Sequence, residues 1–248
     1  MAAKKRKKRS YSRKGVPVKS EKVLRALNKH NSRTKQLNKL AGEINTIIGS
    51  KEYADHFKPR NFYHRLLKKF RQTPGNHRFV LLNQLKGMEI NEINPLQKLG
   101  FFTTTVKKIK NSIEVSLQEI THPQDVLRDA TAYYYDVILL FWEKSKQPAQ
   151  HAMQGTHWMN IEDSKLHLFN FVFENTGDTT HWLLCLHQIL GNNGKREETM
   201  KAEGMQILNV GSFDKKELAL LKVEEEAAKP KPVVKEKMKE VKRVGPVN

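Results

Sequence analysis

Hydrophobic and polar residues alternate along several stretches in the second half of the chain. In residues 112–120, Ile113, Val115 and Leu117 are separated by polar side chains. This period of two is typical of a strand with one buried side and one solvent-facing side. The same reasoning predicts strands at 166–174, 180–190 and 205–210, with a hairpin turn at 175–178.

The longest apolar run, residues 132–142, consists of aromatic and branched residues and contains a single charged residue, Asp136. Such a run predicts a strand that is buried on both faces. A helix of three turns is the alternative, but three consecutive tyrosines and the β-branched pair Val137-Ile138 favour a strand. We therefore expect this strand to lie at the centre of the fold.

The first third of the chain has a helical period instead. From about residue 20 to residue 48, apolar side chains recur three and four positions apart, and Asn31 and Ser32 separate two such groups. This segment is therefore either two helices or one helix with a weak middle. A second helix is expected at 61–71, where an apolar stripe lies beside a basic one, and a third at 77–85.

The turn between the second and third of these helices contains Pro74 and Gly75. Two helices around a tight turn also allow a helix-turn-helix, whose second helix reads a DNA groove. That interpretation is disfavoured, because the second helix offers only Arg78, Asn83 and Gln84 for contacts with bases.

Together these patterns predict an α+β protein, in which a basic helical region at 19–88 precedes an antiparallel β-sandwich-like domain at 89–213. Because no long helices are expected between the strands, a doubly wound sheet is not expected. Residues 1–18 are rich in basic residues and lack acids, so they are expected to be a disordered arm. Residues 214–248 are expected to form a short helix within 214–226 and then a disordered, low-complexity Lys/Glu/Pro tail.

Charge is distributed very unevenly along the chain. The net charge of +19 arises in residues 1–88, which hold 24 Lys or Arg and four acids and so carry +20, whereas the other 160 residues carry −1. Folding does not require such an asymmetry, and a polyanionic partner is its simplest physical reason. The phosphate-binding residues expected from this distribution are Lys4, Lys5, Arg6, Lys7, Lys8, Arg9, Arg13, Lys14, Arg33, Lys35, Arg65, Lys68, Lys69 and Arg71.

Catalytic and metal-binding motifs are not evident. The sequence contains no phosphate-binding glycine loop and no nucleophile elbow. His181, Cys185 and His187 share one face of a predicted strand, but the apolar residues around them favour packed histidines and a buried thiol over a metal site or a Cys-His dyad. Asp136 and Asp129 are acids near the expected core, and a structural role is favoured over a nuclease site for both. No catalytic residue, metal ligand or cofactor is therefore assigned.

The cell compartment is constrained by two features. One cysteine excludes an internal disulfide and fits a reducing compartment, and no run approaches the roughly 20 apolar residues of a membrane-spanning helix. We expect a cytoplasmic location and no membrane partner. The basic cluster at residues 4–9 would also serve as a nuclear import signal.

The sequence thus favours a non-enzymatic protein that associates with DNA or RNA through its basic N-terminal third. The β domain would then dock a protein partner or a second copy of the chain. One alternative is a structural or assembly protein that contacts an acidic protein. A second alternative is an enzyme that processes nucleic acid.

Overall fold

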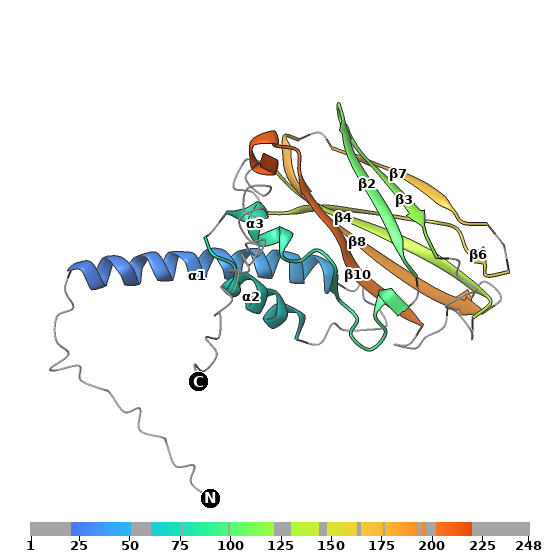
Figure 1. The fold of residues 1–248 in the computed structure, drawn as a ribbon, viewed down its shortest axis with the longest axis horizontal. Helices are drawn as coiled ribbons and strands as arrows, with labels where there is room; N and C mark the ends of the chain where they lie inside the picture. The colour runs from blue at the N-terminus through green and yellow to red at the C-terminus, as the bar shows by residue number, and fades with distance from the viewer. Residues whose placement is uncertain are drawn as a thin grey trace, which may run out of the picture.

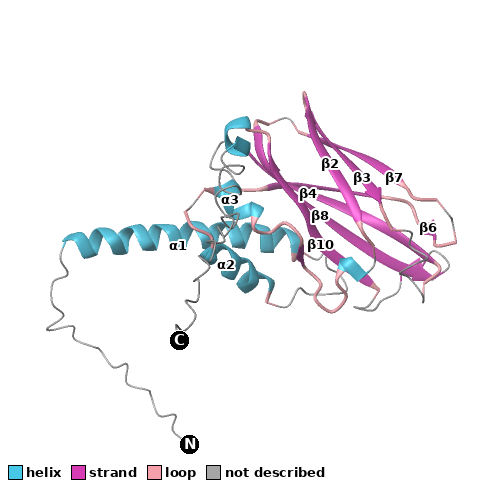
Figure 2. Cartoon of the chain, in the orientation of Figure 1, coloured by secondary structure: helices cyan, strands magenta, loops and turns pink. Residues whose placement is uncertain are grey.

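The computed structural model describes ten segments of the chain, which form a helical layer and two antiparallel sheets (Figures 1 and 2). The expectation of an α+β chain is therefore confirmed at the level of mixed helices and antiparallel strands. The described residues are 21–50, 61–75, 77–98, 100–121, 130–143, 148–162, 165–175, 177–192, 195–196 and 202–219.

The N-terminal region contains α1 (Glu21–Ile48), α2 (Phe62–Gln72) and α3 (Arg78–Asn83). α1 is a single helix of 28 residues, so the segment around Asn31 and Ser32 does not interrupt it. A 3-10 turn, η1 (Leu96–Lys98), follows further along the chain. α3 is shorter than the helix expected at 77–85, because His77 takes an extended conformation at its N-terminal boundary and Gln84 caps its C-terminal end.

The larger sheet has the strand order β1-β10-β8-β4-β5, with two further short strands, β6 and β9, at its margins. All of its pairings are antiparallel, and β4 and β8 form the longest of them. The bounds are β1 (Met88–Glu89), β4 (Ala132–Glu143), β5 (Gln150–Gly155), β6 (Met159–Asn160), β8 (Thr179–Asn192), β9 (Lys195–Arg196) and β10 (Glu203–Ser212).

The smaller sheet has the order β2-β3-β7 and is also antiparallel. Its strands are β2 (Phe102–Ile109), β3 (Ser112–Glu119) and β7 (Leu168–Glu174). Ile113, Val115 and Leu117 are all buried, as the alternation in β3 predicts. The sequence analysis predicted neither β2 nor β5, nor the two-residue strands β1, β6 and β9. The residues of β5 are mostly exposed and have no clear period.

Two hydrophobic cores lie on opposite faces of the larger sheet. Ile138, Leu140 and Trp142 of β4 pack in one cluster with the buried residues of α1, α2 and α3. Val137 and Leu139 belong to a second cluster that also contains the buried residues of β3 and β7. Alternate residues of β4 therefore enter different cores, which is the physical reason that its sequence is apolar throughout.

Side chains also join the margins of the two sheets. The Gln154 amide on β5 donates to the backbone oxygen of Val172 on β7 at 2.6 Å, and accepts from the Val172 N–H at 3.3 Å. At the other margin, Asn209 Nδ2 on β10 donates to Thr104 Oγ1 on β2 at 3.1 Å. These contacts satisfy polar groups that open strand edges would otherwise leave to solvent or to another chain.

Candidate functional site

α1 is packed along only part of its length. Its fully buried residues are confined to the C-terminal half, from Leu37 to Ile48. Among the described side chains of residues 21–32, Leu27 is half-buried and the others are exposed. Figure 1 shows the N-terminal half of this helix extending away from the other elements. The basic N-terminal half of α1 is thus exposed to solvent on most of its circumference.

Two cations of α1 are paired with acids of the same helix. Arg25 forms an ion pair with Glu21 one turn earlier, and Lys39 Nζ lies 3.9 Å from Glu43. These are exposed or partly exposed pairs of the (i, i+4) type, which contribute only a few tenths of a kcal/mol. Such weak pairs leave both cations able to exchange partners with a bound polyanion.

Arg33 has a structural role. Its Nη2 donates a hydrogen bond of 2.6 Å to the backbone oxygen of Thr73, just beyond the C-terminal end of α2. Thr73 Oγ1 in turn donates to the backbone oxygen of Lys69 at 3.0 Å. These bonds hold the end of α2 beside the middle of α1, and so bring the last-turn cations Lys69 and Arg71 to the same region as the α1 cations.

Arg65 is also committed to the fold. Its guanidinium donates to the backbone oxygens of Glu89 and Ile90, and its Nε lies 3.0 Å from a carboxylate oxygen of Glu92. The side chain is only 22% exposed. Of the cations expected to bind phosphate, Arg33 and Arg65 are therefore the two that already have partners within the described chain.

The other cations of α1 and α2 are open to solvent. Within the described segments, α1 and α2 contain only two acids, Glu21 and Glu43, and both are paired as above. We call the remaining set the basic surface: its six exposed side chains form no ion pair with another described residue, and they are Lys22, Lys29, Lys35, Lys68, Lys69 and Arg71. The expected arm residues Lys4, Lys5, Arg6, Lys7, Lys8, Arg9, Arg13 and Lys14 lie outside the described residues.

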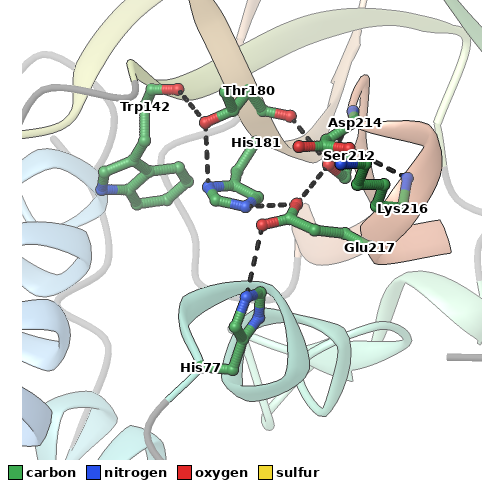
Figure 3. Close-up of polar contacts among 8 residues, drawn as sticks. All are labelled: His77, Trp142, Thr180, His181, Ser212, Asp214, Lys216 and Glu217. Carbon is green, nitrogen blue, oxygen red and sulfur yellow. Dashed lines mark hydrogen bonds and ion pairs between the residues drawn. The ribbon is translucent and has the colours of Figure 1, made fainter. Parts of the chain in front are cut away.

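A polar cluster joins the helical layer to the larger sheet (Figure 3). Glu217, in the short helix formed by residues 215–219, lies between two imidazoles. His181 Nε2 is 2.7 Å from Glu217 Oε2, and His77 Nε2 is 3.4 Å from Oε1. His181 also stacks on Phe79 of α3, with 5.9 Å between ring centroids. A cavity of about 460 Å³ adjoins this cluster and is lined in part by Lys39, Arg78 and Asp214 as well.

Protonation of His181 is disfavoured in the folded chain. Burial lowers its pKa below the ordinary value, and the nearby charges of Arg78 and His77 act in the same direction, whereas Glu217 opposes them. His181 is therefore a neutral donor to Glu217 at neutral pH. The cluster can anchor the C-terminal helix, because three separate segments of the chain meet at one carboxylate.

Glu203 lies in a second buried cluster, on β10. It is fully buried, and it accepts hydrogen bonds from Arg196 Nε and Nη2 and lies 3.1 Å from His187 Nε2. Burial alone would raise its pKa, but the bonds from His187 and Arg196 outweigh burial and hold the pKa below the ordinary value. Asp136 lies 3.9 Å from His187 Nδ1 and has a raised pKa because of burial.

His181, Cys185 and His187 thus lie at different points along β8 and have different partners. Cys185 is fully buried in the helix-facing core, and burial raises the pKa of its thiol, which disfavours a nucleophilic thiolate. His181 and His187 each pair with a different glutamate, in the arrangement described above. No group of three or more His, Cys, Asp or Glu side chains suited to a metal ion occurs among the described residues. Asp129 lies outside them.

Sequence reasoning missed the acids that organise these clusters. Glu217 and Glu203 have no local signal, because each meets partners that are distant or on other strands. Glu119 did have a local signal, because its position continues the alternation of the inward-facing residues Ile113, Val115 and Leu117. Its carboxylate accepts hydrogen bonds from the hydroxyl groups of Tyr133 and Tyr135 in the core between the sheets.

In comparisons with known proteins, no protein-family model and no curated protein matches the chain. No described helix is long and apolar enough to cross a membrane.

Proposed function

We propose that this protein binds the phosphate backbone of a nucleic acid through the basic surface of α1 and α2, together with the basic residues of its N-terminal arm. The observation that carries this proposal is the set of six exposed cations, from Lys22 to Arg71, that have no acidic partner among the described residues. Repulsion between these like charges opposes folding, and phosphates bound to them would reduce that repulsion.

The shape of α1 fits this role. An α-helix with its side chains is about 10–12 Å wide, and the major groove of B-DNA is about 12 Å wide. The N-terminal half of α1 extends beyond the body of the protein, so a duplex can approach it without meeting the sheets (Figure 1). Contacts with phosphates would set affinity in this binding mode, and they carry no sequence information directly.

The β-sandwich-like part of the chain has a supporting role in this proposal, as the platform for a protein partner or a second copy. The lone, buried Cys185 suits a reducing compartment, and the proposal places the protein in the cytoplasm. An acidic protein would also be attracted to the basic surface, so the experiment has to separate these two ligands.

The test is a fluorescence-anisotropy titration of labelled DNA and RNA duplexes and single strands at several salt concentrations. About six phosphate contacts predict a log–log salt slope near −5 on duplex DNA. Changing Lys22, Lys29 and Lys35 to Gln should weaken binding to all sequences alike and reduce the magnitude of the slope by about 2–3.

The matched control changes Lys98, Lys107 and Lys110 to Gln. It removes the same charge from exposed positions of η1, β2 and the turn after β2, and should change the slope much less. A salt-independent affinity, or equal effects of the two triple variants, would contradict the proposed site. A partner-specific complex that survives nuclease treatment would favour the acidic-protein alternative.

A further inference from the structure

The exposed apolar side chains of this protein are concentrated on one face of the smaller sheet. We call it the outer face: it consists of the odd-numbered residues 101–109 and the even-numbered residues 112–120 and 166–174, which point away from the larger sheet. Ten large hydrophobic residues are exposed in the described part of the chain, and six of them lie on the outer face: Phe101, Ile109, Ile120, Leu166, Leu168 and Val172. Monomeric proteins normally expose such residues singly, and a contiguous group marks an interaction surface.

Strand pairing places four of these side chains beside one another. The Ile120 N–H donates to the backbone oxygen of Phe101 at 2.8 Å, so these two residues lie opposite each other on β3 and β2. On the other side of β3, Gln118 is opposite Leu168, which brings Leu166 opposite Ile120 two residues further along. We call Phe101, Ile120, Leu166 and Leu168 the apolar patch; each of them is between 51% and 62% exposed.

The outer face is also nearly neutral. Its charged residues are Lys107, Glu114 and Glu174, one cation and two acids, which give a net charge of −1. Lys107 lies opposite Glu114, and Glu114 is six residues, or about 20 Å, from Ile120 along β3. Two copies that met through this face would therefore bring little like charge together. The basic surface of α1 and α2 would instead repel its own copy.

The shape of the outer face suits the approach of a second sheet. Figure 2 shows the smaller sheet as the outermost layer, with the helices on the far side of the larger sheet. The rows next to the apolar patch carry short polar side chains, among them Thr103, Thr105, Ser116 and Asn170. Short side chains allow two sheets to pack at the usual separation of about 10 Å.

We propose that two copies of this chain associate through their outer faces, with the two apolar patches at the centre of the contact and the polar rows at its rim. This arrangement is the usual anatomy of a protein interface, and a two-fold axis makes one self-complementary patch sufficient. The dimer specifies the second copy that the proposed function leaves open, and it is tested without nucleic acid, so its failure leaves the proposed binding of phosphates unaffected.

The area of the outer face predicts a weak dimer. Five alternate positions extend over about 27 Å, and three strands over about 10–14 Å, so each copy contributes roughly 300–400 Å². A stable interface buries about 800 Å² of each partner. We therefore expect the protein to be a monomer when dilute and a dimer when concentrated.

Sedimentation velocity of the full-length protein, after nuclease treatment, tests the proposal. Protein at about 1 µM to about 200 µM is suitable, because a contact of this size dissociates in the micromolar range or above. The average sedimentation coefficient should rise with concentration from the monomer value towards the dimer value. It should rise at least as much at about 0.5 M salt, where interactions between surface charges are screened.

Two variants locate the contact. Ile120→Lys combined with Leu168→Lys should keep the protein monomeric over the whole concentration range, because four cations would meet in the dimer. Leu168→Thr keeps a β-branched residue in the strand and should raise the dimer dissociation constant about tenfold, since each dimer loses the leucine twice. Far-UV circular dichroism checks that both variants are folded.

The matched control combines Val23→Lys with Ile93→Lys, which adds the same charge at positions that are 45% and 51% exposed outside the outer face. This variant should dimerise like the unmodified protein. An unmodified protein that stays monomeric up to the highest concentration would overturn the proposal. Self-association that is lost at high salt, or that the control variant weakens as much as the double variant of the apolar patch, would also overturn it.

Discussion

The guanidinium of Arg33 and the backbone oxygen of Thr73 are joined by a hydrogen bond of 2.6 Å, which ties the middle of α1 to the end of α2. The bond satisfies a carbonyl beyond the last turn of α2, and it is charge-assisted. Arg33 therefore stabilises the packing of α1 against α2, whereas the exposed cations of the basic surface are available to a ligand. Substitutions can separate the structural role from the binding role.

Arg33→Gln should lower the free energy of unfolding by about 1–2 kcal/mol, because it removes a charge-assisted hydrogen bond from a half-buried site. Lys35→Gln, at an exposed position two residues away, should change it by less than about 0.5 kcal/mol. Urea denaturation followed by circular dichroism measures both. Equal losses of stability would show that the bond to Thr73 does not hold the helices together.

Removal of residues 220–248 tests whether the C-terminal tail contributes to polyanion binding. This segment carries eight Lys or Arg and five acids, a net charge of +3. Because its loss removes positive charge, a chain that ends at Ala219 should bind labelled duplex DNA more weakly at low salt than the full-length chain does. Anisotropy titration of both chains measures the difference. Equal affinities would show that the tail makes no contact with the nucleic acid.

The elements with a strong local period were predicted well from sequence. The strand expected at 132–142 is β4, and the alternation at 112–120 corresponds to β3, because both patterns reflect which side of a strand each residue occupies. β5 was missed, since its exposed residues lack a period and its conformation is set by backbone pairing with β4. Tertiary pairing of this kind leaves little trace in composition.

The excess of basic residues in the candidate site could be predicted from the sequence, but the role of each basic residue could not. Lys68 and Lys69 look the same in sequence as Arg65, yet Arg65 is committed to Glu92 and to backbone oxygens near β1. Likewise, the helical period placed Arg33 on the polar side of α1, but could not show that Thr73 lies within its reach. These partners are separated by 27 and 40 residues in sequence, so only the packed structure reveals them.

The His181 pKa predicts a dependence of stability on pH. Since folding lowers this pKa from the ordinary value of 6.5, the unfolded chain binds the proton more readily than the folded chain. The stability contributed by neutral His181 is therefore fully present above about pH 6.5 and is lost as the pH falls towards the lower folded-state pKa. His181→Gln, which keeps a donor for Glu217, should have a flatter Tm profile between pH 7 and pH 5.

The control for this prediction is His151→Gln, on the exposed strand β5, whose profile should follow that of the unmodified protein. Tm is measured by circular dichroism in buffers of matched ionic strength. A His181→Gln profile as steep as that of the unmodified protein would assign the acid sensitivity to other groups.

Glu203→Gln tests the buried cluster on β10. The substitution keeps the shape of the side chain but removes the charge that Arg196 and His187 contact. It should destabilise the fold by about 3 kcal/mol, because breaking a buried ion pair leaves its partners without compensation. Glu162→Gln at an exposed position is the matched control, with an expected change below about 0.5 kcal/mol.

The cluster around Glu203 also predicts how the stability of the fold changes at acidic pH. Because the pKa of Glu203 is lowered in the fold, the stability it contributes is present above the unfolded-state pKa near 4.5 and is lost as the pH falls through the folded-state value. Urea titrations at pH 7, 5 and 4 should therefore show the difference between Glu203→Gln and the unmodified protein shrinking only below about pH 4.5. A difference that already vanishes at pH 5 would mean that the carboxylate is not held ionised by Arg196 and His187.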